Sequence, residues 1–153
     1  MPHSPRIHDG KLWVLNSGRG ELCRVDEETG AREVVTFLPG FARGLAFHGP
    51  YAFVGLSLPR DGSFSGLELD GELAKRDAEP WCGVQIVDTR NGNIVEWIRL
   101  KGEVRELFDV FVLPGVPTYF SSKLATLATH AAAIIAKLED SDGGVRRAAV
   151  QTL

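Results

Sequence analysis

Residues 82–100, CGVQIVDTRNGNIVEWIRL, repeat residues 20–38, GELCRVDEETGAREVVTFL, without a gap. The alignment places Gly30 on Gly92, and each copy contains two β-prone segments joined by a polar turn. In the second copy the turn contains Asn91 followed by glycine, the dipeptide that type I′ hairpin turns prefer. The two stretches therefore predict two β-hairpins of the same design.

The residues upstream of each copy also match. Residues 7–17 (IHDGKLWVLNS) align with residues 47–57 (FHGPYAFVGLS), which places His8 on His48. A unit of four short strands that recurs at roughly forty residues is typical of β-propeller blades. We therefore expect a mainly β fold of antiparallel, propeller-type blades. Two blades are complete, and residues 108–113 (FDVFVL) are expected to begin part of a third.

Asp26 and Asp88 occupy the same position, just before the turn of each predicted hairpin. A carboxylate at this position can accept hydrogen bonds from backbone N–H groups of the following loop, as in an Asx turn. Catalysis by paired carboxylates would require both groups to meet across one cleft. Because equivalent positions on separate blades do not usually meet, we expect a structural role for both residues.

Residues 58–81 form an insertion that the first copy lacks. The opening of the insertion is rich in turn residues, and residues 69–79 (LDGELAKRDAE) favour one short helix. Long insertions in small domains are often binding loops, although a tolerated surface excursion explains the segment equally well.

The sequence pattern changes after residues 114–117 (PGVP) from strand-like to helical spacing. The expected domains are therefore a β domain at residues 1–115 and an α-helical hairpin at residues 118–153. The apolar positions on one face of the first predicted helix are Leu124, Leu127, Ala128, Ala131, Ile134, Ile135 and Leu138.

Residues 131–153 (AAAIIAKLEDSDGGVRRAAVQTL) resemble a HEAT repeat, in which a turn aspartate and an arginine of the second helix form a ladder between units. Asp142 and Arg146 stand at the matching positions. Because a single repeat cannot bury both of its faces, we expect the hairpin to lean on the β portion, to pair with another chain or to begin a truncated array.

The N-terminal part resembles a family of uncharacterised, propeller-like proteins. The shared phrases are PHSPR from residue 2, LWVLNSGRGEL from residue 12, FLPGFARGLAFHG from residue 37, FSGLELD from residue 64 and CGVQIVDTRNG from residue 82. The resemblance implies a propeller fold and supplies no activity. It also implies a longer parent protein, because closed propellers have about four to eight blades. We therefore expect the chain to be a fragment or a fusion product.

Composition restricts the partners. A formal net charge of −3 gives no general attraction to nucleic acid or to an anionic membrane. No apolar stretch approaches the roughly 20 residues of a membrane helix. The two cysteines, Cys23 and Cys82, fall at different positions of the repeat, so nothing indicates a disulfide. We expect a cytoplasmic protein without a cofactor or a metal.

Five side chains near predicted strand ends are candidates for ligand binding. Arginines at such places can clamp a small anion in a bidentate fashion, or they can tie loops together through backbone carbonyls. A histidine and an asparagine nearby could add hydrogen bonds, although a local turn explains the asparagine equally well. The candidates are His3, Arg6, Asn16, Arg43 and Arg60.

The expected function is non-catalytic binding: the helical hairpin contacts a protein partner, and the blade loops offer a surface for a small anionic ligand. The alternative is a propeller-type enzyme with a metal or polar site in the central channel. In that case His3, His8 or His48 would act together with Asp109.

Overall fold

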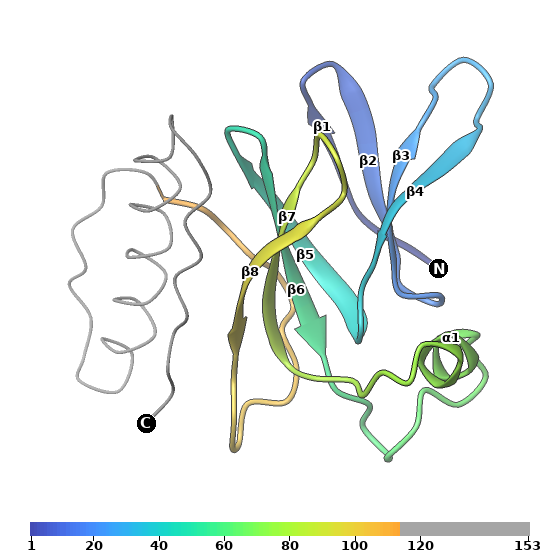
Figure 1. The fold of residues 1–153 in the computed structure, drawn as a ribbon, viewed down its shortest axis with the longest axis vertical. Helices are drawn as coiled ribbons and strands as arrows, with labels where there is room; N and C mark the ends of the chain where they lie inside the picture. The colour runs from blue at the N-terminus through green and yellow to red at the C-terminus, as the bar shows by residue number, and fades with distance from the viewer. Residues whose placement is uncertain (114–153) are drawn as a thin grey trace. The chain divides into compact units, whose positions relative to one another are not determined.

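Within residues 1–113 of this computed structural model, eight strands form two antiparallel sheets of four strands each (Figure 1). The structure describes residues 1–113. The expected helical hairpin at residues 118–153, with its HEAT resemblance and its partner surface, lies outside the described residues.

Both sheets follow the order of the chain. Sheet 1 contains β1 (Pro2–His8), β2 (Lys11–Asn16), β3 (Glu21–Val25) and β4 (Arg32–Phe37). Sheet 2 contains β5 (Phe41–His48), β6 (Tyr51–Ser57), β7 (Gly83–Asp88) and β8 (Ile94–Arg99). The expectation of a mainly β, antiparallel architecture is confirmed.

The internal repeat predicted from the sequence is confirmed at the level of strands. The aligned hairpins become β3–β4 and β7–β8, and both hairpins close at the same aligned pair. In sheet 1 this pair joins Val25 to Arg32, and in sheet 2 it joins Val87 to Ile94. The two stretches therefore follow the same backbone path.

The turn aspartates play the structural role predicted for them. Asp26 accepts a hydrogen bond from the backbone N–H of Thr29 at 2.7 Å. Asp88 accepts one from the backbone N–H of Arg90 at 2.9 Å. Hydrogen bonds to the charged form lower a carboxyl pKa. The pKa of Asp26 is accordingly lowered, chiefly by the hydroxyl of Thr29 and then by its backbone N–H.

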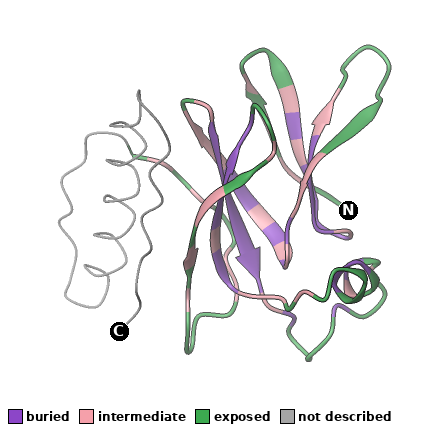
Figure 2. Cartoon of the chain, in the orientation of Figure 1, coloured by how far each residue is buried: buried purple, intermediate pink, exposed green. Residues whose placement is uncertain are grey.

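The core lies between the two sheets, where buried segments of the strands face each other (Figure 2). Side chains alternate along a strand, so every second residue of β2 and of β6 points into this layer. Trp13 in sheet 1 contacts Phe47 in sheet 2, with ring centroids 5.5 Å apart. The buried cluster consists of Trp13, Leu15, Leu22, Leu38, Ala42, Leu45, Ala52, Val54, Leu56 and Val87.

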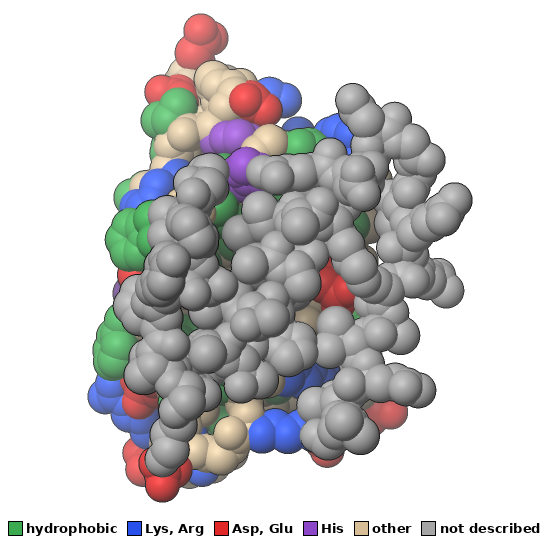
Figure 3. All heavy atoms as spheres, turned by 90° about the vertical axis from the view of Figure 1, so that its left-hand side faces the viewer, with side chains coloured by type: hydrophobic (Ala, Val, Ile, Leu, Met, Phe, Trp, Pro, Cys, Tyr) green, Lys and Arg blue, Asp and Glu red, His purple; other side chains and the backbone are tan. Residues whose placement is uncertain are grey.

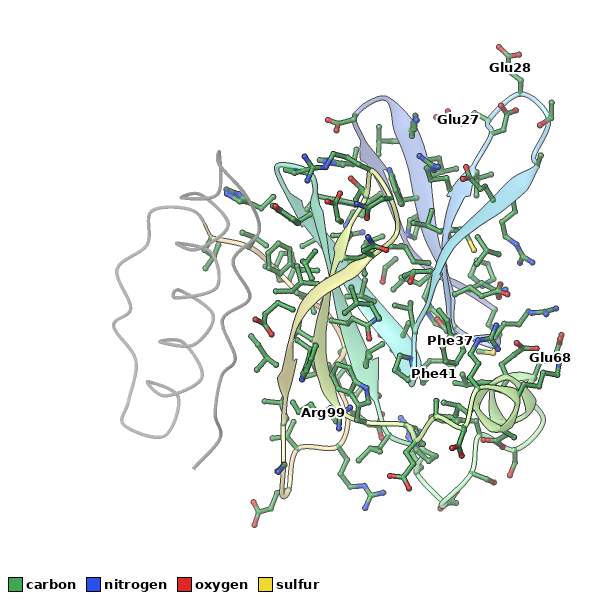
Figure 4. All side chains as sticks on the ribbon, in the orientation of Figure 1. Glu27, Glu28, Phe37, Phe41, Glu68 and Arg99 are labelled. Carbon is green, nitrogen blue, oxygen red and sulfur yellow. The ribbon has the colours of Figure 1, made fainter. Side chains whose placement is uncertain are left out.

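The insertion contains the short helix expected from its sequence, α1 (Leu69–Lys75). Leu69 and Leu73 pack with Phe64 in a second apolar cluster, and Phe37 and Phe41 from the sheets lie against it. Figure 4 shows Phe37 and Phe41 close together beside α1. The insertion is thus packed against the ends of β4 and β5.

Ion pairs reinforce the attachment of α1. The carboxylate of Glu72 accepts hydrogen bonds from Lys75 and Arg76 on its own helix. It also lies 3.7 Å from Arg19 in the β2–β3 loop of sheet 1. The hydrogen bonds from Lys75 and Arg76 lower the pKa of Glu72 to about 2.

Residues 107–113 do not form the strand expected at the start of a third unit. They nevertheless follow sheet 2 in the way that β5 follows sheet 1. The hydroxyl of Ser17 donates a hydrogen bond to the carbonyl of Ala42, and the aligned Ser57 donates one to the carbonyl of Leu107. The packing of successive units is therefore repeated, although the third unit has no sheet within the described residues.

Candidate functional site

Equivalent positions of successive repeats meet at one place. The alignment that places His8 on His48 also places His3 on Arg43 and Ser4 on Gly44. In the structure, the backbone N–H of Gly44 donates a hydrogen bond to Ser4 Oγ at 3.0 Å. The first strands of the two sheets, β1 and β5, therefore lie side by side.

Residues 107–113 continue this arrangement on the other side of β5. A Cβ atom placed on Gly44 would lie only 2.5 Å from the backbone nitrogen of Val110. The carbonyls of Ala42 and Leu107 accept the equivalent serine hydrogen bonds, and Arg43 and Phe108 are the residues that directly follow them. Phe108 is therefore the equivalent of Arg43 in the third unit. We refer to the side chains gathered here as the β1–β5 cluster: His3, Arg6, Phe41, Arg43 and Phe108.

Arg43 is held in this cluster by aromatic rings. Its guanidinium carbon lies 5.0 Å from the ring centroid of Phe41 and 5.7 Å from that of Phe108. The Nε atom is buried and has no hydrogen-bond partner. Because a guanidinium remains charged at any pH of interest, Arg43 keeps a positive charge and at least one unused donor at this place.

His3 contacts the same phenylalanine. Its ring meets the ring of Phe41 edge to face, with centroids 5.5 Å apart, and its Nε2 atom is buried without a hydrogen-bond partner. The pKa of His3 is lowered, first by burial, then by the charge of Arg43 and then by the N-terminal amine. The imidazole is therefore held in its neutral form, next to a cation.

Arg6 lies on the exposed side of the cluster. One of its terminal nitrogens is 3.7 Å from a carboxylate oxygen of Asp109, and both side chains are 40% exposed. Exposed ion pairs of this length contribute little to stability, roughly 0–1 kcal/mol. The cluster thus combines two arginines, a histidine and two aromatic rings, and it has more donors than acceptors.

The structure places the other two candidates elsewhere, in contacts that tie the chain together. Asn16 donates a hydrogen bond from Nδ2 to Glu21 at 2.7 Å. Arg60 binds both carboxylate oxygens of Glu106, at 2.8 and 2.9 Å. His3 and Arg43 are brought together at Phe41, and Arg6 is linked to them only through Asp109, the neighbour of Phe108. Asn16 and Arg60 do not join them.

The groups of the alternative metal site are engaged in other contacts. His8 stacks on Phe47, with ring centroids 4.2 Å apart and an interplanar angle of 7°. Within residues 1–113, no three His, Cys, Asp or Glu side chains are grouped in a way that could hold a metal ion. Burial raises the pKa of the Cys23 thiol to about 11, which makes this thiol a poor nucleophile near neutral pH.

An open hollow lies at the other end of sheet 1, beside the hairpin turns. Acidic and basic side chains both line it, and Arg24 binds Glu33 there at 2.6 Å. Acidic and basic side chains are also mixed on the visible part of the face in Figure 3. The lining of the hollow therefore does not favour a ligand of one charge.

The sequence did not reveal Phe41 and Phe108 as members of the cluster. The available signal was the alignment of His3 with Arg43, which continues the match upstream of residue 7. Because histidine and arginine differ in type and a bulge interrupts β1 between His3 and Arg6, similarity alone does not draw attention to this match.

Comparison with known proteins adds a family. A search of curated proteins finds no match. No helix in the described part of the chain is long and apolar enough to cross a membrane. A family model described as "Domain of unknown function (DUF4915)" matches residues 1–120. The match covers the whole described region, including the β1–β5 cluster, and the chain belongs to this DUF4915 family.

Proposed function

We propose that the chain is a non-catalytic binding module built from propeller-type blades, with its ligand site at the β1–β5 cluster. The two sheets would be neighbouring blades, and further sheets of the same kind would complete the ring. In such an arrangement the first strand of each blade lines the central channel. The ligand would then be held at the channel by residues of successive blades.

The observation that carries this proposal is the meeting of three equivalent positions, His3, Arg43 and Phe108. Equivalent positions at the turns of separate blades do not usually meet, whereas first strands that surround a common axis bring their equivalent residues together. The cluster also holds buried nitrogens without hydrogen-bond partners, on His3 and on Arg43. Unpaired buried nitrogens also occur on His8, Arg19 and Arg24, but each of these side chains lies beside a carboxylate. Within residues 1–113, His3 and Arg43 have no carboxylate partner, and buried polar atoms without partners favour a role in binding.

A binding role is also supported over catalysis by the nature of the groups. The carboxylates near the cluster are Asp109, which pairs with Arg6, and Glu106, which pairs with Arg60. A general acid–base mechanism needs a free titratable group beside its partner, and a metal site needs several ligands close together. The described residues offer a positively charged, ring-lined surface instead.

Protein-observed NMR with a library of small neutral and charged fragments tests the proposal. We expect bound fragments to shift the backbone amide signals of His3, Arg43 and Phe108. An Arg43→Ala, Phe108→Ala double variant should lose these shifts, because the cation and one ring wall are removed.

Arg99→Ala provides the matched control, since Arg99 on β8 lies over the ring of Trp81, 5.0 Å from its centroid, outside the cluster. This variant should keep the fragment shifts. Fragments that bind the double variant as well as the wild type, or a library without any binder, would refute the proposed site.

A further inference from the structure

We propose that the β1–β5 cluster binds a small oxyanion, of the carboxylate or phosphate type, between the guanidinium of Arg43 and the imidazole of His3, and that binding takes up a proton at His3. This inference rests on the proposed function and names its ligand class. The repeat aligns these two residues with each other, and the juxtaposition of β1 and β5 brings them together.

The charge of Arg43 is the first part of the argument. Within residues 1–113 its guanidinium makes no ion pair, and its contacts are the rings of Phe41 and Phe108. A planar guanidinium presents its N–H donors as a fork that matches two oxygens of a carboxylate or phosphate group. The rings leave this fork positively charged and shield it partly from water, which strengthens its attraction for an anion.

The imidazole of His3 is the second part. Its ring and the Arg43 guanidinium lie against the same phenylalanine, and its buried Nε2 has no partner. Burial and the neighbouring cations keep the free imidazole neutral. An oxyanion placed between the two residues would cancel the repulsion from Arg43 and accept a hydrogen bond from protonated Nε2. The protonated form would then become favourable.

The remaining charges around His3 do not supply this anion themselves. The cations that act on it are Arg43 on β5 and the N-terminal amine. The nearby carboxylates are Asp109, which pairs with Arg6, and Glu106, which binds Arg60 and lies within the electrostatic reach of Arg43. Both carboxylates already have arginine partners, so the positive field at His3 and Arg43 remains for a ligand.

Isothermal titration calorimetry with sulfate and with benzoate tests the inference, because both anions keep their charge between about pH 8 and pH 5.5, where a histidine titrates. Sulfate represents a phosphate-type group and benzoate a carboxylate. Affinity should rise as the pH falls, by about tenfold for each unit by which the anion raises the pKa of His3. Titrations in buffers of different ionisation enthalpy should show proton uptake.

Three variants of the full chain make the test specific. Arg43→Gln should weaken binding of the anion by roughly tenfold or more, because a charged hydrogen-bond donor is lost. His3→Gln should remove the pH dependence and the proton uptake while leaving weaker binding. Arg99→Gln should bind like the wild type, because Arg99 also lies over an aromatic ring, that of Trp81, but outside the cluster.

The outcomes separate this inference from the proposed function. Binding that is independent of pH, or unchanged in Arg43→Gln, would overturn the inference. If neither anion binds but a neutral fragment still binds at the cluster, the ligand class is wrong and the binding module stands. If neither anions nor fragments bind there, both proposals fail.

Discussion

Three segments meet at Gly44: β1, β5 and residues 107–113. The backbone of Gly44 has φ of +77°, a conformation that side chains with a Cβ rarely adopt, and its N–H binds Ser4. The aligned residue, Ser4, also has a positive φ, of 49°. The same unusual backbone conformation therefore recurs at the first strand of each sheet, and the close approach of residues 109–110 adds a steric requirement at Gly44.

A pair of glycine substitutions separates the two requirements. Gly30 has φ of +70°, close to that of Gly44, but no heavy atom lies within 4 Å of a Cβ placed on it. Gly30→Ala should therefore cost about 1 kcal/mol of unfolding free energy from backbone strain alone. Gly44→Ala should cost clearly more, because its methyl group meets the backbone of Asp109 and Val110.

Urea unfolding measures the two costs, and hydrogen exchange locates the effect. In Gly44→Ala the amides of residues 107–113 should exchange faster than in the wild type, whereas in Gly30→Ala they should not. Equal costs for both substitutions would show that the segment does not pack against β5 as described.

At the scale of elements, ion pairs help to hold the insertion and its helix in place, although the insertion has no counterpart in the first copy of the repeat. α1 has only seven residues, too few for stability on its own. Its position depends on the apolar contacts of Leu69 and Leu73 and on the ion pairs of Glu72. Glu72 thus links α1 to the β2–β3 loop of sheet 1 through its ion pair with Arg19.

Glu72→Gln should make the attachment of α1 less dependent on pH. The pKa of Glu72 in the folded chain, about 2, lies below its ordinary value of 4.5, so the ionised carboxylate stabilises the fold. This contribution is complete above pH 4.5 and is lost as the pH falls from about 4.5 towards 2. The variant should therefore be less stable than the wild type near neutral pH, and the difference should shrink through this range.

Chemical unfolding at a series of pH values measures this difference. Glu28→Gln is a suitable control, because Glu28 lies at the exposed tip of the β3–β4 hairpin (Figure 4). A difference between wild type and Glu72→Gln that stays constant from neutral pH down to about pH 2 would contradict the assigned role of Glu72.

The sequence predicted those elements whose formation depends on local patterns. The two hairpins were predictable because each has an aspartate before its turn, Asp26 or Asp88, and a glycine within the turn. α1 was predictable because its residues favour a helix within a turn-rich insertion. The strand expected at residues 108–113 is not formed. Its apolar composition favours a strand, but a strand also needs a partner to share its hydrogen bonds, and composition does not supply one.

The candidate site was predictable only in part, for a related reason. The sequence indicated His3, Arg6 and Arg43 by residue type and by their nearness to strand ends. Their meeting depends on the packing of β1 beside β5, which involves residues far apart in the chain. Asn16 and Arg60 have equally suitable side chains, and only the tertiary contacts with Glu21 and Glu106 assign them to structural roles.

At the scale of the whole molecule, one apolar layer joins the two sheets. Residues from β2 and β3 interlock there with residues from β5, β6 and β7. Neither sheet alone buries its apolar face, so each stabilises the other. Residues 1–113 should therefore unfold as a single cooperative unit.

Leu45→Ala tests this cooperativity. Leu45 is fully buried between the sheets, and its truncation should cost about 2–5 kcal/mol of unfolding free energy through lost contacts and a residual cavity. Tryptophan fluorescence and far-ultraviolet circular dichroism should report the same shifted urea midpoint, because both sheets lose stability together. Separate transitions for the two signals would show that the sheets fold independently.

Val34→Ala is the control for this measurement, since Val34 is 49% exposed on β4. It should shift the midpoint much less, because most of its side chain is already in contact with water.

The serine hydrogen bonds that join successive units have an evolutionary consequence. Ser17 directly follows β2 and Ser57 ends β6, and their hydroxyls bind the beginning of the next unit, at Ala42 and Leu107. A gene segment that encodes one unit therefore also encodes the serine that binds the start of the next unit. Duplication of such a segment can lengthen the array at its seams without compensating changes elsewhere, which offers protein engineers a natural place to splice in additional copies.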